Sequence, residues 1–340
     1  MPKLNDAQRD RQDRAFFDEA RSWLGGPLLV AAAILAYTAG MQTDHQTRSG
    51  GFAYAIAAYA VWGVAPIYLM LLMKVPPVEL VGWRIIFTVP ICLVIVVARR
   101  QVQAVRLALG HPRVLMTLLA SAMLIATNWM TFVLAVQSGH VLAASVGYYV
   151  NPLVNVLFAT IFLKERLSGL QWLAVLIAAC GVALLAWGAL DTLWISVSLA
   201  LSFSSYGFLR KIVPVESLPG LTIETLLLLI PASGIVAWYG ASAQGSALVN
   251  HPENAMWILG FGVLTATPLL LFAAAARRMD FTTLGFTQYL GPTLTLIVGL
   301  VVFGEPLRPA QAICFVLIWT AIAVFSFDLL QKRRRARTRD

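Results

Sequence analysis

Four residues recur at helical spacing inside the apolar segment 141–163. They are Tyr148, Asn151, Pro152 and Asn155. Because they are three or four positions apart, they share one face of a helix. A polar face on a membrane helix lies against protein or water rather than lipid, so these side chains are candidates to bind a small molecule through hydrogen bonds.

The segment 281–303 carries a similar set of residues. It consists of Gln288, Gly291, Pro292 and Thr295. Pro152 and Pro292 each remove a backbone donor, so we expect both helices to kink near mid-depth. Two kinked helices, each with a polar face beside its proline, are candidates for the walls of a central substrate pathway. The alternative is that the amides only bond neighbouring helices, each bond contributing about 1 kcal/mol or less.

Three residues on other segments are supporting candidates for substrate contact. Asn128 lies on the segment 114–135, while Tyr59 and Trp62 lie on the segment 51–72. Aromatic residues near helix ends usually anchor the protein at the membrane surface. Trp62 lies about a dozen residues into its segment, which is too deep for that belt, so it is the stronger aromatic candidate.

Arg84 is the most isolated charge in the chain, about seven residues inside the segment 78–98. A lone arginine at such depth costs roughly 2.5 to 3.5 kcal/mol on insertion scales, so something must compensate it. An anionic substrate or backbone carbonyls freed at a helix kink could each compensate the Arg84 charge. The alternative is that the side chain extends outward to the lipid headgroups.

Glu79 and Glu224 each lie near the start of the second helix of their half. Either carboxylate is a candidate, with weak support, to bind a coupling proton. The ordinary alternative, which we favour, is a helix N-terminal carboxylate stabilised by the helix dipole. Glu165 and Glu305 are interpreted as structural turn residues rather than gates.

The elements that must position these residues are membrane helices. Apolar residues make up 59% of the chain, charged residues only 12%, and the mean hydropathy is +0.77, which excludes a soluble globular protein. Crossing the hydrocarbon takes roughly 20 mostly apolar residues in a helix. Ten segments fit: about 51–72, 78–98, 114–135, 141–163, 170–190, 193–209, 221–240, 256–276, 281–303 and 310–330. The predicted fold class is therefore an all-α polytopic membrane protein.

The chain also contains an internal repeat. Residues 146–171 and 286–311 align at an offset of 140 and share tyrosine, proline, glutamate, leucine and glutamine. The offset contains an odd number of membrane helices, so the copies lie in opposite orientations. We therefore expect two inverted five-helix repeats, 51–190 and 193–330, an arrangement typical of secondary transporters.

The basic residues alternate from loop to loop. Most lie on the side that holds the loop before residue 114 and the basic tail 331–340, whereas Lys74 and Arg308 lie on the opposite side. By the positive-inside rule, both ends of the ten-helix body are cytoplasmic. The net charge of +9 is thereby explained without a nucleic-acid partner.

Residues 1–46 have no place in a five-plus-five repeat. A charged stretch, Lys3 to Arg21, precedes an apolar run, Leu24 to Met41. Two hypotheses stay open: one extra N-terminal apolar helix, or a start codon assigned too far upstream, with Met41 as the natural beginning.

From Gly51 onward the chain resembles the drug/metabolite transporter superfamily, EamA-type, and within it the RarD-type (chloramphenicol-sensitivity protein) subfamily. The matching stretches include AAYAVWGVAPIYLMLL at 57–72, NWMTFVLAV at 128–136, SVGYYVNPLVNVLFATIFLKERL at 145–167, SYGFLRK at 205–211 and LGFTQYLGPTLT at 284–295. The resemblance implies a multi-pass exporter of the bacterial inner membrane with both termini inside. The subfamily name links it to chloramphenicol sensitivity and does not settle a substrate.

The expected function is transport of small metabolites or drugs such as chloramphenicol-like compounds, by alternating access of two halves. The expected partners are a small-molecule substrate and membrane lipid, with no cofactor and no metal; the sequence does not predict an oligomeric state. A lipid scramblase or passive channel is the alternative. An enzyme is remote, because the four histidines lie in loops or at helix ends and no reactive groups converge at depth.

Overall fold

The computed structural model describes residues 48–337, except 73–74, 139, 189, 243–244, 251, 253–254, 303 and 305–306. The N-terminal extension 1–46, with its predicted apolar helix, and Glu305 lie outside the described residues. Within the described ranges all regular structure is helical. Helix α15 continues to Arg337, so most of the predicted basic tail is part of the last helix.

In the part of the chain that the structure describes, ten helical crossings are long and apolar enough to span a membrane, which confirms the predicted number. They are α3 (Arg48–Met70), α4 (Pro77–Ala98), α6 (Pro112–Gln137), α7 (Val141–Ile161), α8 (Gly169–Trp187), α9 (Leu193–Ile212), α10 (Ser217–Ala241), α12 (Ala255–Arg278), the pair α13 (Phe281–Gln288) and α14 (Leu290–Val301), and α15 (Pro309–Arg337). Short helices α5 (Val102–Leu109), η1 (Leu190–Thr192) and α11 (Ala247–Asn250) connect them.

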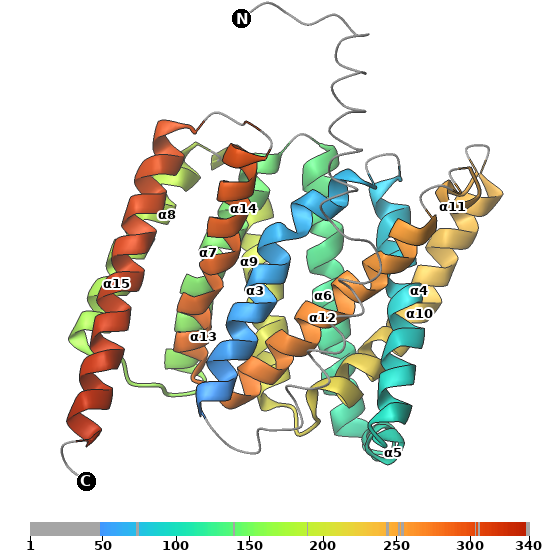
Figure 1. Cartoon of the computed structure of the whole chain (residues 1–340), viewed down its shortest axis with the longest axis horizontal. Coiled ribbons are helices and arrows are strands. Elements are labelled where there is room, and N and C mark those ends of the chain that lie inside the picture. The colour runs from blue at the N-terminus through green and yellow to red at the C-terminus, as the bar shows by residue number, and fades with distance from the viewer. Residues whose placement is uncertain are drawn as a thin grey trace, which may run out of the picture.

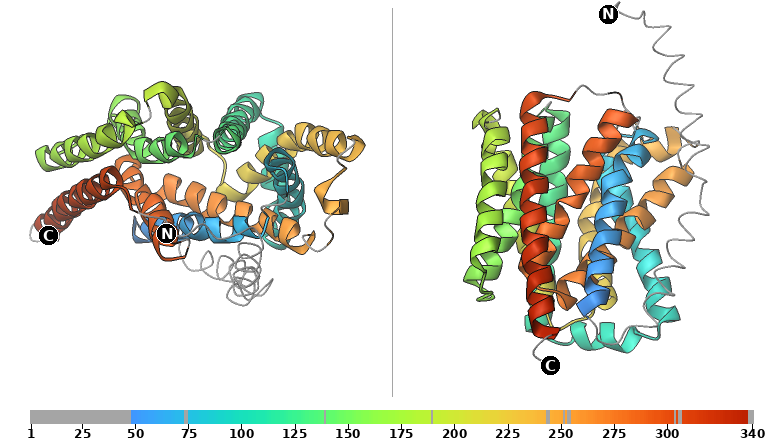
Figure 2. Two further views of the ribbon diagram at one scale, coloured as in Figure 1. Left: turned by 90° about the horizontal axis from the view of Figure 1, so that it is seen from above. Right: turned by 60° about the vertical axis from the view of Figure 1, so that its left-hand side comes forward.

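The helices form an elongated bundle (Figures 1 and 2). The pair α8 and α15 lies at one end of the long axis, and α4 packs on α10 at the other end. Between them, α7 packs on α9 while α13 and α14 pack on α3. Helix α6 packs on α9, and α12 packs on α3. The contact of α7 with α9 thus corresponds to that of α13 and α14 with α3, and the contact of α6 with α9 to that of α12 with α3.

Two of the repeated residues stabilise helix starts. Gln171 forms a capping box with Ser168 at the start of α8: the Gln171 backbone N–H donates to Ser168 Oγ, and the Ser168 N–H donates to Gln171 Oε1. At the start of α15, the Arg308 N–H donates to Gln311 Oε1 over 3.0 Å. The glutamine shared by the two copies thus serves one structural purpose in both.

Glu165 also caps a helix, but across the two halves of the chain. Its carboxylate accepts from the N–H groups of Phe281 (2.7 Å) and Thr282 (3.1 Å) at the start of α13. A carboxylate at this position satisfies donors that have no partner within the helix and complements the helix dipole. This contact agrees with the prediction that Glu165 is a structural turn residue.

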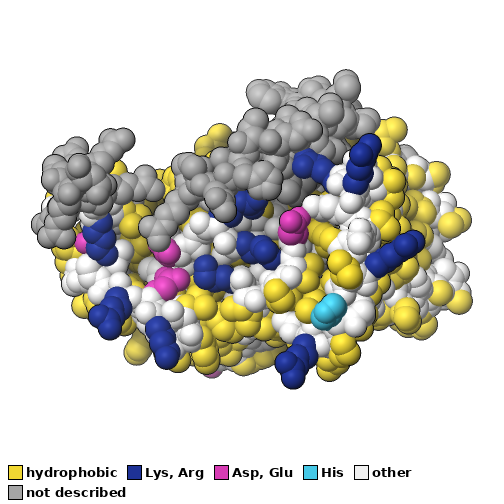
Figure 3. Space-filling view, turned by 90° about the horizontal axis from the view of Figure 1, so that it is seen from below, with side chains coloured by type: hydrophobic (Ala, Val, Ile, Leu, Met, Phe, Trp, Pro, Cys, Tyr) yellow, Lys and Arg dark blue, Asp and Glu magenta, His cyan; other side chains and the backbone are white. Residues whose placement is uncertain are grey.

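The sides of the bundle are apolar, whereas one of its ends is rich in basic side chains. Large apolar side chains such as Trp187, Ile230 and Val301 are exposed along the sides, where the hydrocarbon of a membrane would cover them. The end seen from below carries many lysine and arginine side chains and few acidic ones (Figure 3). Helix α15 ends on this side (Figure 1), which we term the basic end.

Close packing of α4 and α12 depends on Gly262. A Cβ there would lie 2.8 Å from both the carbonyl carbon and the Cβ of Phe87, so the backbones would have to separate. We expect Gly262→Ala to destabilise the protein by about 1–3 kcal/mol, through overpacking. The measurement is the thermal unfolding midpoint in detergent.

Gly234 is the matched control for that substitution. It lies on the exposed face of α10, and a Cβ there would meet nothing within 4 Å. Gly234→Ala should leave the midpoint unchanged or raise it slightly, since alanine restricts the unfolded chain. Equal effects of both substitutions would contradict the packing explanation.

Candidate functional site

A cavity of about 400 Å³ lies between the central helices. On α3 it is lined by residues between Tyr59 and Leu69, in the later half of that helix. On α7 it is lined by residues between Ala144 and Asn151, in the earlier half. On α14 it extends from Gly291 to Leu300, one residue before that helix ends. The cavity therefore runs from mid-depth to the end of the bundle opposite the basic end.

Seven of the eight predicted substrate contacts line this cavity. They are Trp62, Arg84, Asn128, Tyr148, Asn151, Gln288 and Thr295. The eighth, Asn155, lies one turn deeper on α7 and donates from Nδ2 to Gln288 Oε1 over 2.8 Å. Residues from six helices, distant in the sequence, thus converge on one space.

The amides of Asn151, Asn155 and Gln288 form the inner end of the site. Asn151 is fully buried, and neither its Nδ2 nor its Oδ1 has a hydrogen-bond partner among the described residues. An unsatisfied buried polar group costs about 1–3 kcal/mol, so an amide left in this state is a candidate to bond a bound molecule. The Tyr59 hydroxyl, which also lines the cavity, is likewise buried without a partner in the described chain.

Asn128 and Thr295 have structural bonds as well as cavity positions. Asn128 Nδ2 donates to the carbonyl of Leu199 (2.9 Å) and to Ser202 Oγ (3.1 Å), which ties α6 to α9. Thr295 Oγ1 donates to the carbonyl of Gly63 on α3 over 3.3 Å. For Asn128 and Thr295, the bonds therefore support the alternative that the side chain serves to hold neighbouring helices together.

Arg84 is held inside the bundle and does not extend outward to headgroups. Its Nε donates to Thr265 Oγ1 over 3.1 Å, and its guanidinium carbon lies 3.9 Å from the centre of the Trp129 ring and 5.1 Å from that of Phe261. Cation–π contacts contribute about 0.5–2 kcal/mol each and offset much of the insertion cost, but neither they nor the threonine hydroxyl neutralise the charge. The charge therefore remains available to a molecule in the cavity.

Much of the aromatic wall was absent from the sequence prediction. Trp129, Phe132 and Phe261 line the cavity, and the Phe132 ring packs 5.7 Å from that of Tyr148. In a membrane helix an aromatic residue suits lipid and protein contacts equally, so its type does not reveal which way it faces. The one available signal is helical spacing: Trp129 is adjacent to Asn128, and Phe132 lies one turn beyond it.

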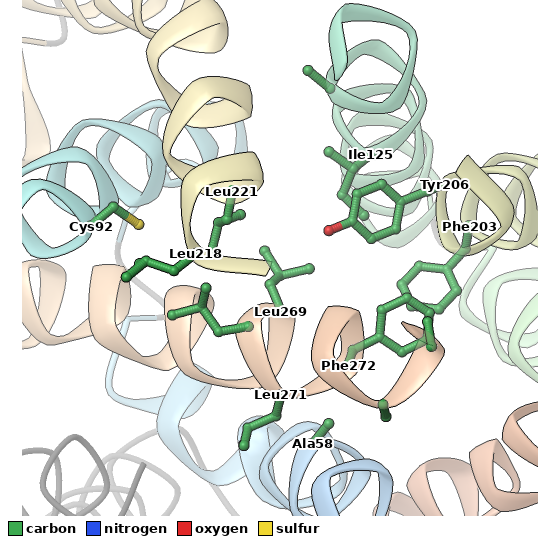
Figure 4. Packing of buried hydrophobic residues seen from close by; sticks show 14 of the residues in the cluster. Ala58, Cys92, Ile125, Phe203, Tyr206, Leu218, Leu221, Leu269, Leu271 and Phe272 are labelled. Carbon is green, nitrogen blue, oxygen red and sulfur yellow. The ribbon is translucent and has the colours of Figure 1, made fainter. Parts of the chain in front are cut away.

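The half of the bundle nearer the basic end is filled by side chains. Phe272 of α12 is its centre, with ring contacts to Tyr59, Trp62, Phe203 and Tyr206 at 5.2 to 6.3 Å. Figure 4 shows Phe203 and Tyr206 of α9 and Leu221 of α10 directed toward Leu269 and Phe272. The cavity is thus open toward one end and closed toward the other.

The two prolines differ in their effect on the helices. The ninth crossing divides at Tyr289, three residues before Pro292, into α13 and α14. This break lies where proline removes the bond to the carbonyl four residues earlier. Pro152 lies within α7, which is one uninterrupted helix, so a kink there stays a prediction.

The two candidate coupling carboxylates lie outside the cavity lining. Glu79, fully buried, accepts from Ser246 Oγ (2.6 Å), the Ala247 N–H (3.0 Å) and Trp83 Nε1 (3.0 Å). It therefore caps the start of α11, rather than only stabilising its own helix. Glu224 accepts from Ser121 Oγ, and its Oε1 lies 3.6 Å from Nη1 of the buried Arg210.

Comparison with known proteins gives consistent matches over most of the chain. A model of the EamA-like transporter family matches residues 49–187. An "uncharacterized transporter" of Pseudomonas aeruginosa is 43% identical over 84% of this chain and 96% of its own. Protein RarD of Escherichia coli K12 is 38% identical over 85% and 98%, and the "chloramphenicol-sensitive protein RarD" of Pseudomonas aeruginosa is 30% identical over 84% and 97%.

A solved crystal structure shares the fold at low sequence similarity. It superposes with a TM-score of 0.66 and 18% identity, covering 82% of this chain and 98% of the other. At that identity the match concerns the arrangement of helices alone.

Proposed function

Since the chain belongs to the EamA-like transporter family, in its RarD-type branch, we propose that it is a carrier that exports small organic molecules by alternating access. The observation that supports this most is the central cavity, which is open toward one end, closed toward the other, and lined by Asn151, whose side-chain amide has no hydrogen-bond partner among the described residues. A carrier needs such a site near mid-membrane.

We further propose that the two five-helix halves, 51–190 and 193–330, are inverted repeats that rock against each other. The paired packing of α7 on α9 and of α13 and α14 on α3 supports a two-fold relation. So do the shared glutamine caps of α8 and α15. Rocking about this axis would close the present opening and expose the cavity toward the basic end.

The proposed orientation places the basic end in the cytoplasm of a bacterial inner membrane. After replacement of the three native cysteines, we expect His140→Cys, between α6 and α7, to react with a membrane-impermeant maleimide in intact spheroplasts. Arg113→Cys, at the opposite end of α6, should react only after permeabilisation. Both positions are exposed. Labelling in the reverse order would disprove the orientation.

Counterflow in proteoliposomes tests the carrier function. The purified protein is reconstituted and offered labelled amino acids, nucleosides, sugars and chloramphenicol, the last because of the relative's name. Saturable counterflow of one class, stimulated by unlabelled solute inside, is the expected result. Flux that neither saturates nor exchanges would identify a channel or a lipid scramblase instead, and no flux of any solute would remove the support for this function.

A further inference from the structure

Arg84 is the one charged residue among the described residues that line the cavity. No aspartate or glutamate contributes to that lining within the described ranges, and no carboxylate there lies within ion-pair distance of the guanidinium. Glu79, on the same helix, is bonded to Ser246, Ala247 and Trp83 instead. The cavity therefore carries an unneutralised positive charge at membrane depth.

The contacts of Arg84 fix the guanidinium without using most of its donors. The bond to Thr265 Oγ1 uses Nε, one of five N–H groups on the side chain. Stacking on Trp129 at 3.9 Å limits the positions that the planar group can take. A guanidinium held in this way is suited to two parallel hydrogen bonds with a carboxylate.

We propose that the transported solutes are organic carboxylates with a flat or aromatic body, and that Arg84 binds the carboxylate. This inference rests on the proposed carrier function and names the substrate class of the same site. The amides of Asn151 and Gln288, at the inner end, bond a second polar group of the solute. Trp62, Trp129 and Phe132 pack against the apolar body between these two ends.

The same arrangement disfavours solutes of other charge. A cation would be repelled by Arg84 in a region of low dielectric, where the interaction is weakly screened. A neutral solute would bury the guanidinium without a counter-ion, which costs free energy. The charge of Arg84 alone therefore favours anionic solutes over cationic and neutral ones, whatever their shape.

A pair of matched probes tests the inference by isothermal titration calorimetry on the purified full-length protein. N-acetylphenylalanine has a carboxylate, a ring and an amide; N-acetylphenylalaninamide has a neutral amide in place of the carboxylate. We expect the wild type to bind the acid about 10- to 100-fold more tightly than the amide, the range expected for a charge-assisted hydrogen bond. Arg84→Gln should remove this preference, and Arg84→Lys should retain part of it.

Arg308→Gln is the control, because it removes one positive charge at the same end of the bundle from an exposed position outside the cavity lining. It should bind the acid as the wild type does. A wild type that binds both probes equally, binds neither, or prefers the amide would overturn the inference, as would an Arg84→Gln protein that keeps the preference. Counterflow of a neutral solute alongside these results would leave the carrier function standing.

Discussion

Replacing Arg210 by leucine is expected to destabilise the protein by about 3–5 kcal/mol, the cost of breaking a buried ion pair by removing one partner. Arg210 is fully buried on α9, where Nη2 donates to the carbonyl of Ser217 over 2.9 Å and Nη1 faces Glu224. The room for the guanidinium exists because residue 220 is glycine; a Cβ at that position would collide with it. Removal of the arginine leaves the Glu224 carboxylate buried without its counter-ion.

The double substitution Arg210→Leu/Glu224→Leu separates this cause from a simple packing defect. Because both charges are then absent, it should recover most of the lost stability. The measurement is the thermal or detergent unfolding midpoint of the single variant, the double variant and one control. Arg308→Gln is the control: Arg308 is exposed, so its loss should cost less than about 1 kcal/mol.

A double variant as unstable as Arg210→Leu, or an Arg210→Leu protein with an unchanged midpoint, would contradict a stabilising ion pair. The pair also lies in the closed half of the bundle, so the destabilised single variant should lose transport together with its fold. Transport by the recovered double variant would then show that the pair is structural and does not carry a coupling proton.

Asn151→Leu is expected to reduce transport by about 10- to 100-fold without lowering stability. Leucine has the same number and branching of side-chain heavy atoms as asparagine, and the asparagine amide has no hydrogen-bond partner among the described residues. Its removal therefore costs the protein no internal bond, while a bound solute loses one. Initial rates of counterflow and the unfolding midpoint, measured on the same preparation, test both halves of the prediction.

Two matched variants help to interpret that result. Gln288→Leu should also lose transport, but it deprives Asn155 Nδ2 of its acceptor, so a modest loss of stability is expected as well. Asn128→Leu breaks two bonds to α9 and should lower stability by about 1 kcal/mol. Normal transport by both Asn151→Leu and Gln288→Leu would show that these amides do not form the substrate site.

The crossings and much of the cavity were predictable because polar residues are rare inside apolar segments. Asn151, Gln288 and Arg84 each interrupt such a segment, and each lines the cavity. A polar group at that depth must face protein or water, so its type alone indicates its direction. The repeat between 146–171 and 286–311 similarly pointed to the α7 and α13–α14 crossings as the walls.

Other parts of the molecule depend on contacts that the sequence does not reveal. By the positive-inside rule, Arg210 is only one of the basic residues on the cytoplasmic side, whereas packing of α9 on its neighbours buries it beside Glu224. The same rule applies to Lys211, yet its Nζ donates to the carbonyls of Ala276 and Met279. Glu79 caps α11, a helix about 170 residues later in the chain, which no local pattern predicts. In each case the contacted group lies outside the residue's own helix, so a local sequence pattern does not predict the contact.

Thiol reactivity at two positions is the most direct test of alternating access. Leu296 lines the open part of the cavity, and Ala276 lies one turn beyond Phe272 toward the basic end, fully buried. Single cysteines at these positions are to be labelled in proteoliposomes with and without a solute that shows counterflow. Alternating access predicts reciprocal changes: conditions that expose position 276 from the basic end protect position 296. Simultaneous reaction of both positions, or changes at one that do not depend on the other, would contradict it.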